Sequence, residues 1–390
     1  MMKNLITENT HDLISSKQFT YKEIIGQPEL WLKVWKLVKE QKSEISRLLK
    51  KVKGSSKLHI ILTGAGTSAF IGDVLEGIFQ KETGIITKAI PTTDIVTHPE
   101  LYFQKDKDVL LISFARSGSS PESSKAVQLA ELLSHKVLNM VITCNKKSLL
   151  TDSVVGTDNL ILLLPPESDD KGLAMTGSFT SMLLTGLLIA NIDRINEKES
   201  DINLLIKYGN LIIKEYLTSL KQISELEFER AVFLGSGVMK GIARESHLKL
   251  QELTDGKIIC KYDSFLGFRH GPKAIINEKT LVTFLFSNNE YVNKYEVDFV
   301  RAVSEGRKPI FSLGVMERKI EGINTDLNII LGNNKNKISE EYLAVVSVLP
   351  AQILGFLKSL HLGLNPDNPS ESGMIHRVVK GVNVYPYDGK

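Results

Sequence analysis

The chain has 390 residues, enough for about two or three domains, and its 42% hydrophobic and 24% charged residues are an ordinary balance for a soluble globular protein. A formal net charge of +3 is small for this length, and the one short basic run, at 48–53, is better explained as a solvated helix end, which excludes nucleic acid as a partner. Two cysteines, Cys144 and Cys260, are too few for a disulfide framework and lack metal-type spacing, so we expect no metal.

The N-terminal segment carries no apolar signal core, so we expect a cytoplasmic protein with no membrane partner. The first fifty residues have helical periodicity. The sequence TYKE predicts a capping box, in which Thr20 accepts from backbone N–H groups and Glu23 reaches back. The helix that follows places Trp31 and Trp35 on one apolar stripe. We therefore expect a helical arm over residues 1–53 that packs its two tryptophans onto another element.

After the arm, apolar strands alternate with helices. We expect strands at 58–64, 108–114, 136–145 and 159–165. This alternation predicts an α/β fold in which a parallel sheet is flanked by helices on both faces, a three-layer αβα arrangement. Two apolar segments predict buried core helices, and both are too short to span a bilayer: 179–192 and 342–357.

The pattern begins again in the second half of the chain. The stretch HIILTGAGTSAFIGDVL (59–75) resembles AVFLGSGVMKGIARESH (231–247), and each is an apolar strand, a Gly-x-Gly turn and a helix. Further strands are expected at 280–287 and 308–315. Two α/β units of similar build are therefore predicted. We expect an arm at 1–53, a first domain at 54–205, a second at 206–365 and a tail that closes the site at 366–390.

Hydroxyl side chains distinguish the two halves. Thr67 and Ser68 follow the first Gly-x-Gly turn, whereas Val238 and Met239 follow the second. A serine-rich turn, SFARSGSSPES at 113–123, also has no counterpart in the second half. Because helix caps alone would be needed in both halves, this difference suggests that the first unit binds a ligand.

A phosphate monoester is the ligand that these loops fit best. A strand-to-helix turn presents free backbone N–H groups, hydroxyls add neutral donors, and Arg116 adds one positive charge. Two other interpretations stay open: the serines only cap a helix, or GAGTSA belongs to a dinucleotide site. The second lacks the acidic residue expected about 20 positions later. No Walker loop is present.

Three charged residues share one helix face in the second half. Glu245, Lys249 and Glu252 lie at i, i+4 and i+7 in GIARESHLKLQEL. One interpretation is a solvated ion pair of little energetic value. The other is acid–base chemistry, since moving a carbonyl between C1 and C2 of a sugar needs a base for the C2 proton.

Four motifs in order resemble those of sugar isomerase (SIS) domains: GAGTS, RSGSSPES and RHGP, preceded by KEIIGQPELW, which resembles the start of the isomerase module of glucosamine-6-phosphate synthase. Three further motifs are similar to the AgaS-type branch, described as tagatose-6-phosphate ketose/aldose isomerase or galactosamine-6-phosphate deaminase: GLAMTGSFT, FLGFRHGPKAI and HRVVKGV. The resemblance spans residue 20 to the end. It implies two tandem SIS domains after the helical arm.

The resemblance also implies roles for individual residues. The implied phosphate binders are Gly66, Thr67, Ser68, Arg116, Ser117, Ser119 and Ser120. This sequence departs from the family loop at Ala115, where the family has another serine. Thr176 is implied to line the sugar.

In the same family, Glu252 is the general base, supported by Lys249 and Glu245. His270 opens the sugar ring from the neighbouring subunit, which implies a homodimer with shared active sites. Lys380 in the tail matches a family lysine near the sugar.

The resemblance implies conversion of D-galactosamine 6-phosphate to D-tagatose 6-phosphate, without a cofactor. Water would hydrolyse a C2 iminium and release ammonia, so we expect the enzyme to be a hydrolase as well as an isomerase. Ketose/aldose isomerisation without deamination is the first alternative, because it uses the same proton shuttle. A non-catalytic sugar-phosphate sensor is the second. It would need the hydroxyl loops but neither Glu252 nor His270, so their joint presence favours an enzyme.

Overall fold

The computed structural model describes residues 18–52, 56–154, 156, 159–333, 336–379 and 381–388. Two compact units are present, each built around one five-stranded sheet. The β1–β5 unit contains Leu30–Asp169, Gly177–Glu199 and the chain from Ile375 onward. The β6–β10 unit contains the chain up to Glu29, Asp170–Thr176 and Ser200–Met374. These are compact bodies rather than successive segments, so the four-segment division expected from the sequence stays a prediction.

The described part of the expected arm at 1–53, residues 18–52, is helical, and the rest of the arm lies outside the described residues. The described part comprises α2 (Phe19–Ile25), α3 (Gln27–Glu40) and α4 (Lys42–Val52). Both tryptophans of α3 are buried, and the Trp31 indole donates to the Thr180 hydroxyl at 3.0 Å. The packing expected for the two tryptophans is therefore confirmed.

The predicted capping box is wrong. Helix α2 begins two residues earlier than expected, because Gln18 rather than Thr20 is its N-cap, and the Gln18 side chain makes no capping hydrogen bond. The Thr20 hydroxyl instead donates to Asp367 at 2.8 Å, and the Glu23 carboxylate accepts from the amides of Lys171 and Gly172. Both side chains bind groups far away in the sequence, and a local motif cannot report such partners.

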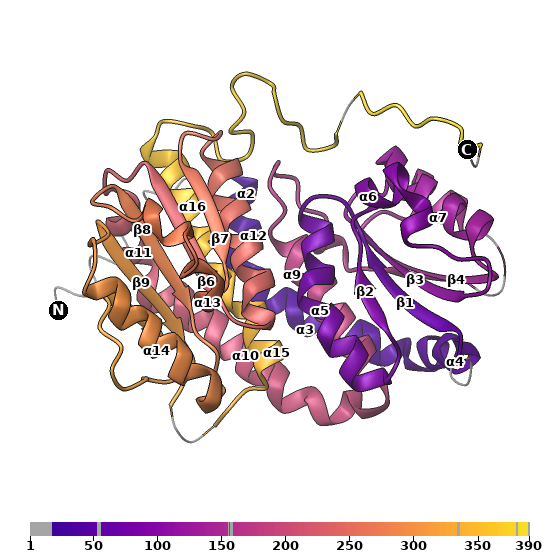
Figure 1. The fold of residues 1–390 in the computed structure, drawn as a ribbon, viewed down its shortest axis with the longest axis horizontal. Coiled ribbons are helices and arrows are strands. Elements are labelled where there is room, and N and C mark those ends of the chain that lie inside the picture. The colour runs from indigo at the N-terminus through magenta and orange to yellow at the C-terminus, as the bar shows by residue number, and fades with distance from the viewer. Residues whose placement is uncertain are drawn as a thin grey trace. The chain divides into compact units, whose positions relative to one another are not determined.

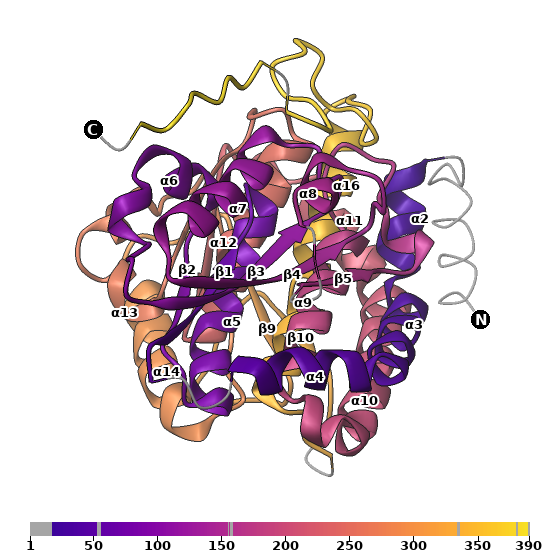
Figure 2. The ribbon, with the colours of Figure 1, turned by 90° about the vertical axis from the view of Figure 1, so that its right-hand side faces the viewer.

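The β1–β5 sheet is parallel throughout, in the order β2-β1-β3-β4-β5. Its strands are β1 (Leu58–Thr63), β2 (Thr87–Ala89), β3 (Asp108–Ala115), β4 (Lys136–Thr143) and β5 (Asn159–Leu163). Helices cover both faces (Figure 2). On one face lie α5 (Thr67–Thr83) and α9 (Gly177–Ala190); on the other lie α6 (Thr92–Thr97), α7 (Pro121–Leu133) and α8 (Leu149–Ser153).

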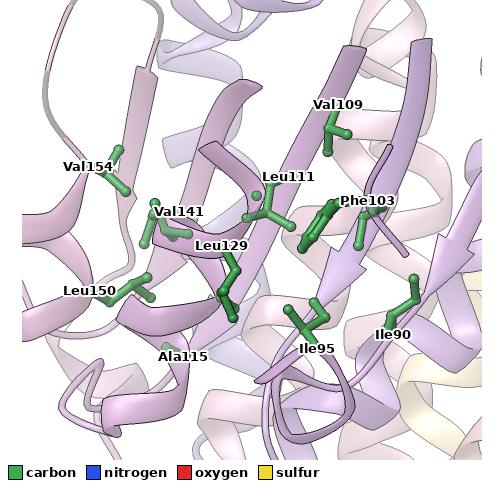
Figure 3. Close-up of a cluster of buried hydrophobic side chains, with 14 residues drawn as sticks. Ile90, Ile95, Phe103, Val109, Leu111, Ala115, Leu129, Val141, Leu150 and Val154 are labelled. Carbon is green, nitrogen blue, oxygen red and sulfur yellow. The ribbon is translucent and has the colours of Figure 1, made fainter. Parts of the chain in front are cut away.

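An apolar cluster fills the space between β1, β3 and β4 and the second group of helices. Leu111 and Val141 point from the sheet toward Leu129 of α7 and Ile95 of α6 (Figure 3). All four side chains are fully buried or nearly so. This packing holds the N-terminus of α7 at the end of β3.

The β6–β10 sheet repeats this design in the order β10-β9-β8-β6-β7, again parallel throughout (Figure 1). Its strands are β6 (Arg230–Gly235), β7 (Ile259–Asp263), β8 (Thr280–Leu285), β9 (Phe311–Met316) and β10 (Leu327–Ile330). Its helices are α10 (Glu199–Leu211), α11 (Leu217–Ser224), α12 (Val238–Leu253), α13 (Phe265–Phe268), α14 (Glu290–Ser304), α15 (Glu340–Ser347) and α16 (Leu349–His361). The short helical segments of the two units are the 3-10 helices η1 (Pro99–Leu101), η2 (Pro166–Ser168), η3 (Ile192–Lys198) and η5 (Pro272–Ile275) and the π-helix η4 (Ile212–Tyr216).

The two Gly-x-Gly turns have nearly the same backbone. Gly66 has φ 56° and ψ −130°, and Gly237 has φ 55° and ψ −124°. No residue with a side chain could replace Gly64 or Gly235, the first glycine of each turn, without a steric clash. A Cβ at Gly64 would lie 2.7 Å from the Ser68 backbone, and one at Gly235 would lie 2.3 Å from the Met239 carbonyl. The internal repeat seen in the sequence is therefore confirmed.

Among the described residues, one helical stretch is long and apolar enough to cross a membrane, Glu340–His361, which includes α15 and α16. The sequence predicted a helix too short to span a bilayer, and the observed length of 22 residues shows that this prediction was wrong. Because 94% of its apolar window is buried inside the protein, the stretch is a core helix, as predicted.

Candidate functional site

Two loops leave the β1–β5 sheet at the same edge. Strands β1 and β3 are neighbours and run parallel, with Thr63 paired to Ser113. The Gly-x-Gly turn after β1 and the serine-rich turn after β3 therefore lie at the carboxyl ends of adjacent strands, each followed by the N-terminus of a helix. This is the place where open α/β sheets bind ligands, and two helix N-termini favour an anion there.

The structure speaks against serines that serve only as helix caps. Ser120 occupies the N-cap position of α7, but its side chain makes no capping hydrogen bond. The N-cap of α5 is Gly66, which has no side chain to cap with. In the same unit, Ser148 caps α8 through a complete capping box. The hydroxyl of Ser120 thus differs from a true cap nearby.

Neighbouring residues fix the shape of the serine-rich loop. Gly118 has φ 62°, and a Cβ there would lie 2.4 Å from the Ser148 hydroxyl. The Asn145 amide, from the loop after β4, donates to the Ser117 carbonyl at 3.0 Å. The Ser119 amide donates to the Ser117 hydroxyl at 3.3 Å. Three serines remain half-exposed at the sheet edge, namely Ser117, Ser119 and Ser120.

The other predicted phosphate binders are more deeply placed. Thr67 and Ser68, in the first turn of α5, are buried. Arg116 is also buried, and its guanidinium donates to the Arg377 carbonyl at 2.7 Å. Arg377 itself forms an ion pair with Asp169 at 2.7 Å. The sequence did not identify Asp169 and Arg377, because nothing local marks residues 208 positions apart as partners.

The charged face of α12 is an interior feature. Glu245 and Lys249 have no exposed side-chain surface, while the Glu252 side chain keeps 25% of its own. The Lys249 ammonium lies 2.6 Å from a Glu252 oxygen and 3.4 Å from a Glu245 oxygen. Burial alone would lower the pKa of Lys249, but the two carboxylates outweigh burial and raise that pKa above its usual value. The interpretation as a solvated surface pair is therefore wrong.

This trio can perform acid–base chemistry. A buried ammonium holds Glu252 in place and compensates its charge, and the exposed part of Glu252 faces solvent. His247, on the same helix, is a half-buried neighbour that the sequence did not single out. Burial lowers the pKa of His247 to about 4, and its ring lies 4.9 Å from that of Tyr262.

The remaining predicted site residues have different surroundings. His270 is exposed, and it lies between α13 and Gly271, whose φ is 123°. Thr176 is fully buried, and its hydroxyl donates to Asp170 at 3.1 Å. Lys380 lies outside the described residues. Among the described residues, no three His, Cys, Asp or Glu side chains are grouped so that they could hold a metal ion.

The sheet edges and hydroxyl loops are those of a known domain class. The SIS domain family matches residues 55–192, which include both hydroxyl loops. Two solved structures are similar over almost the whole chain. A protein of Clostridium novyi NT assigned as a tagatose-6-phosphate ketose/aldose isomerase is 39% identical, with a TM-score of 0.92 and 95% of both chains covered. The tagatose-6-phosphate ketose/aldose isomerase of Escherichia coli is 33% identical, with a TM-score of 0.85, covering 96% of this chain and 98% of that one.

A curated relative indicates the family to which the chain belongs within the SIS-domain class. The D-galactosamine-6-phosphate deaminase AgaS of Shewanella sp. (strain ANA-3) is 38% identical over 394 residues, with 97% of each chain covered. The chain therefore belongs to the AgaS family of SIS-domain enzymes, and its α/β fold consists of two tandem SIS domains. The hydrolase class expected from the sequence is wrong, because these relatives are named deaminases and isomerases.

Proposed function

We propose that this chain converts D-galactosamine 6-phosphate to D-tagatose 6-phosphate and ammonia. The observation that carries the proposal is the buried Lys249 on α12, held between two carboxylates of which only Glu252 reaches solvent. Such a group is suited to move one proton between adjacent carbons. The AgaS relatives are named for this substrate, and they match the chain over nearly its full length.

In this proposal the β1–β5 unit binds the phosphate. The ligands are the hydroxyls and amides of the two loops, with Arg116 as the one cation. The uncapped Ser120, the fixed Gly118 turn and the two helix N-termini support this role. The predicted binders are Gly66, Thr67, Ser68, Arg116, Ser117, Ser119 and Ser120.

Glu252 then acts as the general base. It takes the C2 proton of the open-chain amino aldose, which leaves an enolamine, and returns a proton to C1, which gives an imine at C2. Water adds to C2 and ammonia leaves, so the ketose is the product and atoms balance. Lys249 orients Glu252 and stabilises its charge, and Glu245 holds Lys249 in turn.

His270 opens the sugar ring in this scheme, and we assign it to the site of a neighbouring subunit in a cytoplasmic homodimer. Its exposure on a short loop supports a role outside its own unit. Thr176 and Lys380 stay proposed sugar contacts. The Thr176 hydroxyl donates to Asp170, which would hold the 170–176 loop in shape around the sugar.

Isomerisation without deamination is a second candidate, because two structural relatives carry the name of tagatose-6-phosphate ketose/aldose isomerase. A comparison of four substrates separates the two. Ammonia and ketose are measured with galactosamine 6-phosphate, glucosamine 6-phosphate, galactose 6-phosphate and tagatose 6-phosphate. We expect ammonia from galactosamine 6-phosphate to form fastest. Faster interchange of the two neutral sugars would favour the isomerase, and no turnover of any would contradict both.

Shared sites can be tested by mixing two inactive variants, Glu252→Gln and His270→Ala. If each site combines these residues from different subunits, half of the dimers after subunit exchange are mixed, and half of their sites are intact. About a quarter of wild-type activity should then return. No recovery after confirmed exchange would mean that both residues act within one chain.

A further inference from the structure

The β6–β10 unit has an anion at the edge where the β1–β5 unit has its hydroxyls. Glu296, on α14, has a fully buried side chain. The Ser287 amide, in the loop after β8, donates to its two carboxylate oxygens at 3.2 and 3.4 Å. The Asn293 side-chain amide donates to one of these oxygens at 3.0 Å.

A second loop contributes to the same carboxylate. The Ser236 hydroxyl, between the glycines of the turn after β6, also donates to Glu296. Strands β6 and β8 are parallel neighbours, and they occupy the places that β1 and β3 have in the other sheet. One carboxylate therefore collects donors from the two loops that correspond to the phosphate-binding pair.

The corresponding position in the β1–β5 unit is apolar. Glu296 lies six residues after the start of α14, and six residues after the start of α7 stands Val127, which is fully buried. Among the described residues, none accepts a hydrogen bond from the amides of Ser117 or Gly118. The β1–β5 unit therefore has no built-in carboxylate at this position of its serine-rich loop.

Two further carboxylates add negative charge at the carboxyl edge of the β6–β10 sheet, and this charge disfavours phosphate binding there. The Ser287 hydroxyl donates to Glu340, and the Asn288 side chain donates to Glu317 at 2.8 Å. Burial raises the pKa of Glu296 to about 7, with the Glu340 charge adding to the rise, while the donors from Ser236, Asn293 and Ser287 oppose it. Above that pH, Glu296 is an anion that its donors hold inside the unit.

We propose that the donors of Ser236, Ser287 and Asn293 form an anion-binding nest in the β6–β10 unit, and that the carboxylate of Glu296 is the built-in ligand of this nest. Phosphate therefore binds only in the β1–β5 unit. When Glu296 is replaced by a residue with a shorter side chain, the nest binds a small free carboxylate ion in its place. Glu340 still excludes phosphate in that case, because a second negative charge lies beside the nest. This inference does not depend on the proposed reaction.

Chemical rescue tests it at pH 8 with formate as the probe. Glu296→Ala should melt below wild type, and formate should raise its melting temperature in a saturable way. Glu290→Ala, on an exposed position of the same helix, is the matched control and should not respond. Glu296→Gln keeps an oxygen acceptor, so it should fold without formate and show no saturable response.

Phosphate supplies the second arm of the test. It should not stabilise Glu296→Ala through this nest, but it should stabilise the double variant Glu296→Ala/Glu340→Gln, both compared with wild type. The inference is overturned if formate raises the melting temperature of Glu296→Ala no more than that of Glu290→Ala. It is also overturned if Glu296→Ala fails to fold in formate as well as in its absence while Glu296→Gln folds.

Discussion

Replacing Lys249 by methionine should destabilise the protein strongly, because it leaves buried carboxylates without their counter-charge. The ammonium lies 2.6 Å from Glu252 and 3.4 Å from Glu245, and neither Lys249 nor Glu245 has exposed side-chain surface. Breaking a buried pair by removing one partner costs about 3–5 kcal/mol, so we expect a loss of that order in the free energy of unfolding near pH 8.

The loss should depend on pH. As the pH falls toward 5, protonation of the carboxylates that have lost their partner removes the buried charge. The difference in the free energy of unfolding between Lys249→Met and wild type should therefore shrink. In the wild type, the raised pKa of Lys249 means that its contribution is complete below about 10.4 and is lost only as pH rises through the folded-state pKa.

Urea unfolding at pH 5 and pH 8 measures both effects. Lys240→Met is the matched control, since Lys240 lies on the same helix but is exposed; it should cost less than about 0.5 kcal/mol. The double variant Glu245→Gln/Lys249→Met should recover part of the stability, because it removes a charge together with its partner. A Lys249→Met loss as small as that of Lys240→Met, or equal at both pH values, would refute this explanation.

Four further substitutions test other parts of the molecule. Gly118→Ala forces a Cβ to 2.4 Å from a neighbouring hydroxyl at φ 62°, so it should cost about 1–3 kcal/mol in chemical unfolding and weaken phosphate binding. Gly77→Ala, in α5 with open space around it, should instead stabilise by about 0.5–1 kcal/mol. Burial raises the pKa of Glu23 to about 7, so its ionisation should destabilise the wild type as pH rises from 4.5 to 7, and melting curves of Glu23→Gln should lack that decline. Arg116→Ala should raise KM by about tenfold or more through loss of a charged hydrogen bond, and an unchanged KM would remove Arg116 from the phosphate site.

The central strands of both sheets could be predicted from the sequence, whereas three edge strands could not. Strands β1, β3, β4, β6 and β8 are nearly continuous apolar runs, because helices bury them on both faces. The missed strands are β2, β7 and β10, and each lies at a sheet edge. Their sequences, TKA, ICKYD and LNII, are short or mixed, since an edge strand needs less apolar surface.

For the site, spacing placed Glu245, Lys249 and Glu252 on one helix face but could not show that this face is interior. The i, i+4 pattern is the same for a solvated pair and for a buried one. Burial of the trio depends on α15 and α16, which pack on α12 from about 100 residues later. The tail contact between Arg116 and Arg377 escaped prediction for the same reason, since its acceptor is a backbone carbonyl and carries no sequence signal.

The most direct test of the proposed mechanism compares wild type with Glu252→Gln, using galactosamine 6-phosphate for both binding and ammonia release. If Glu252 moves the proton and the hydroxyl loops hold the phosphate, the variant should bind the sugar phosphate with little change in Kd. Its kcat for ammonia release should fall by about 10²–10⁴-fold. Ammonia release at the wild-type rate, or loss of sugar-phosphate binding in a folded Glu252→Gln protein, would contradict the assignment of proton transfer to Glu252 and of phosphate binding to the hydroxyl loops.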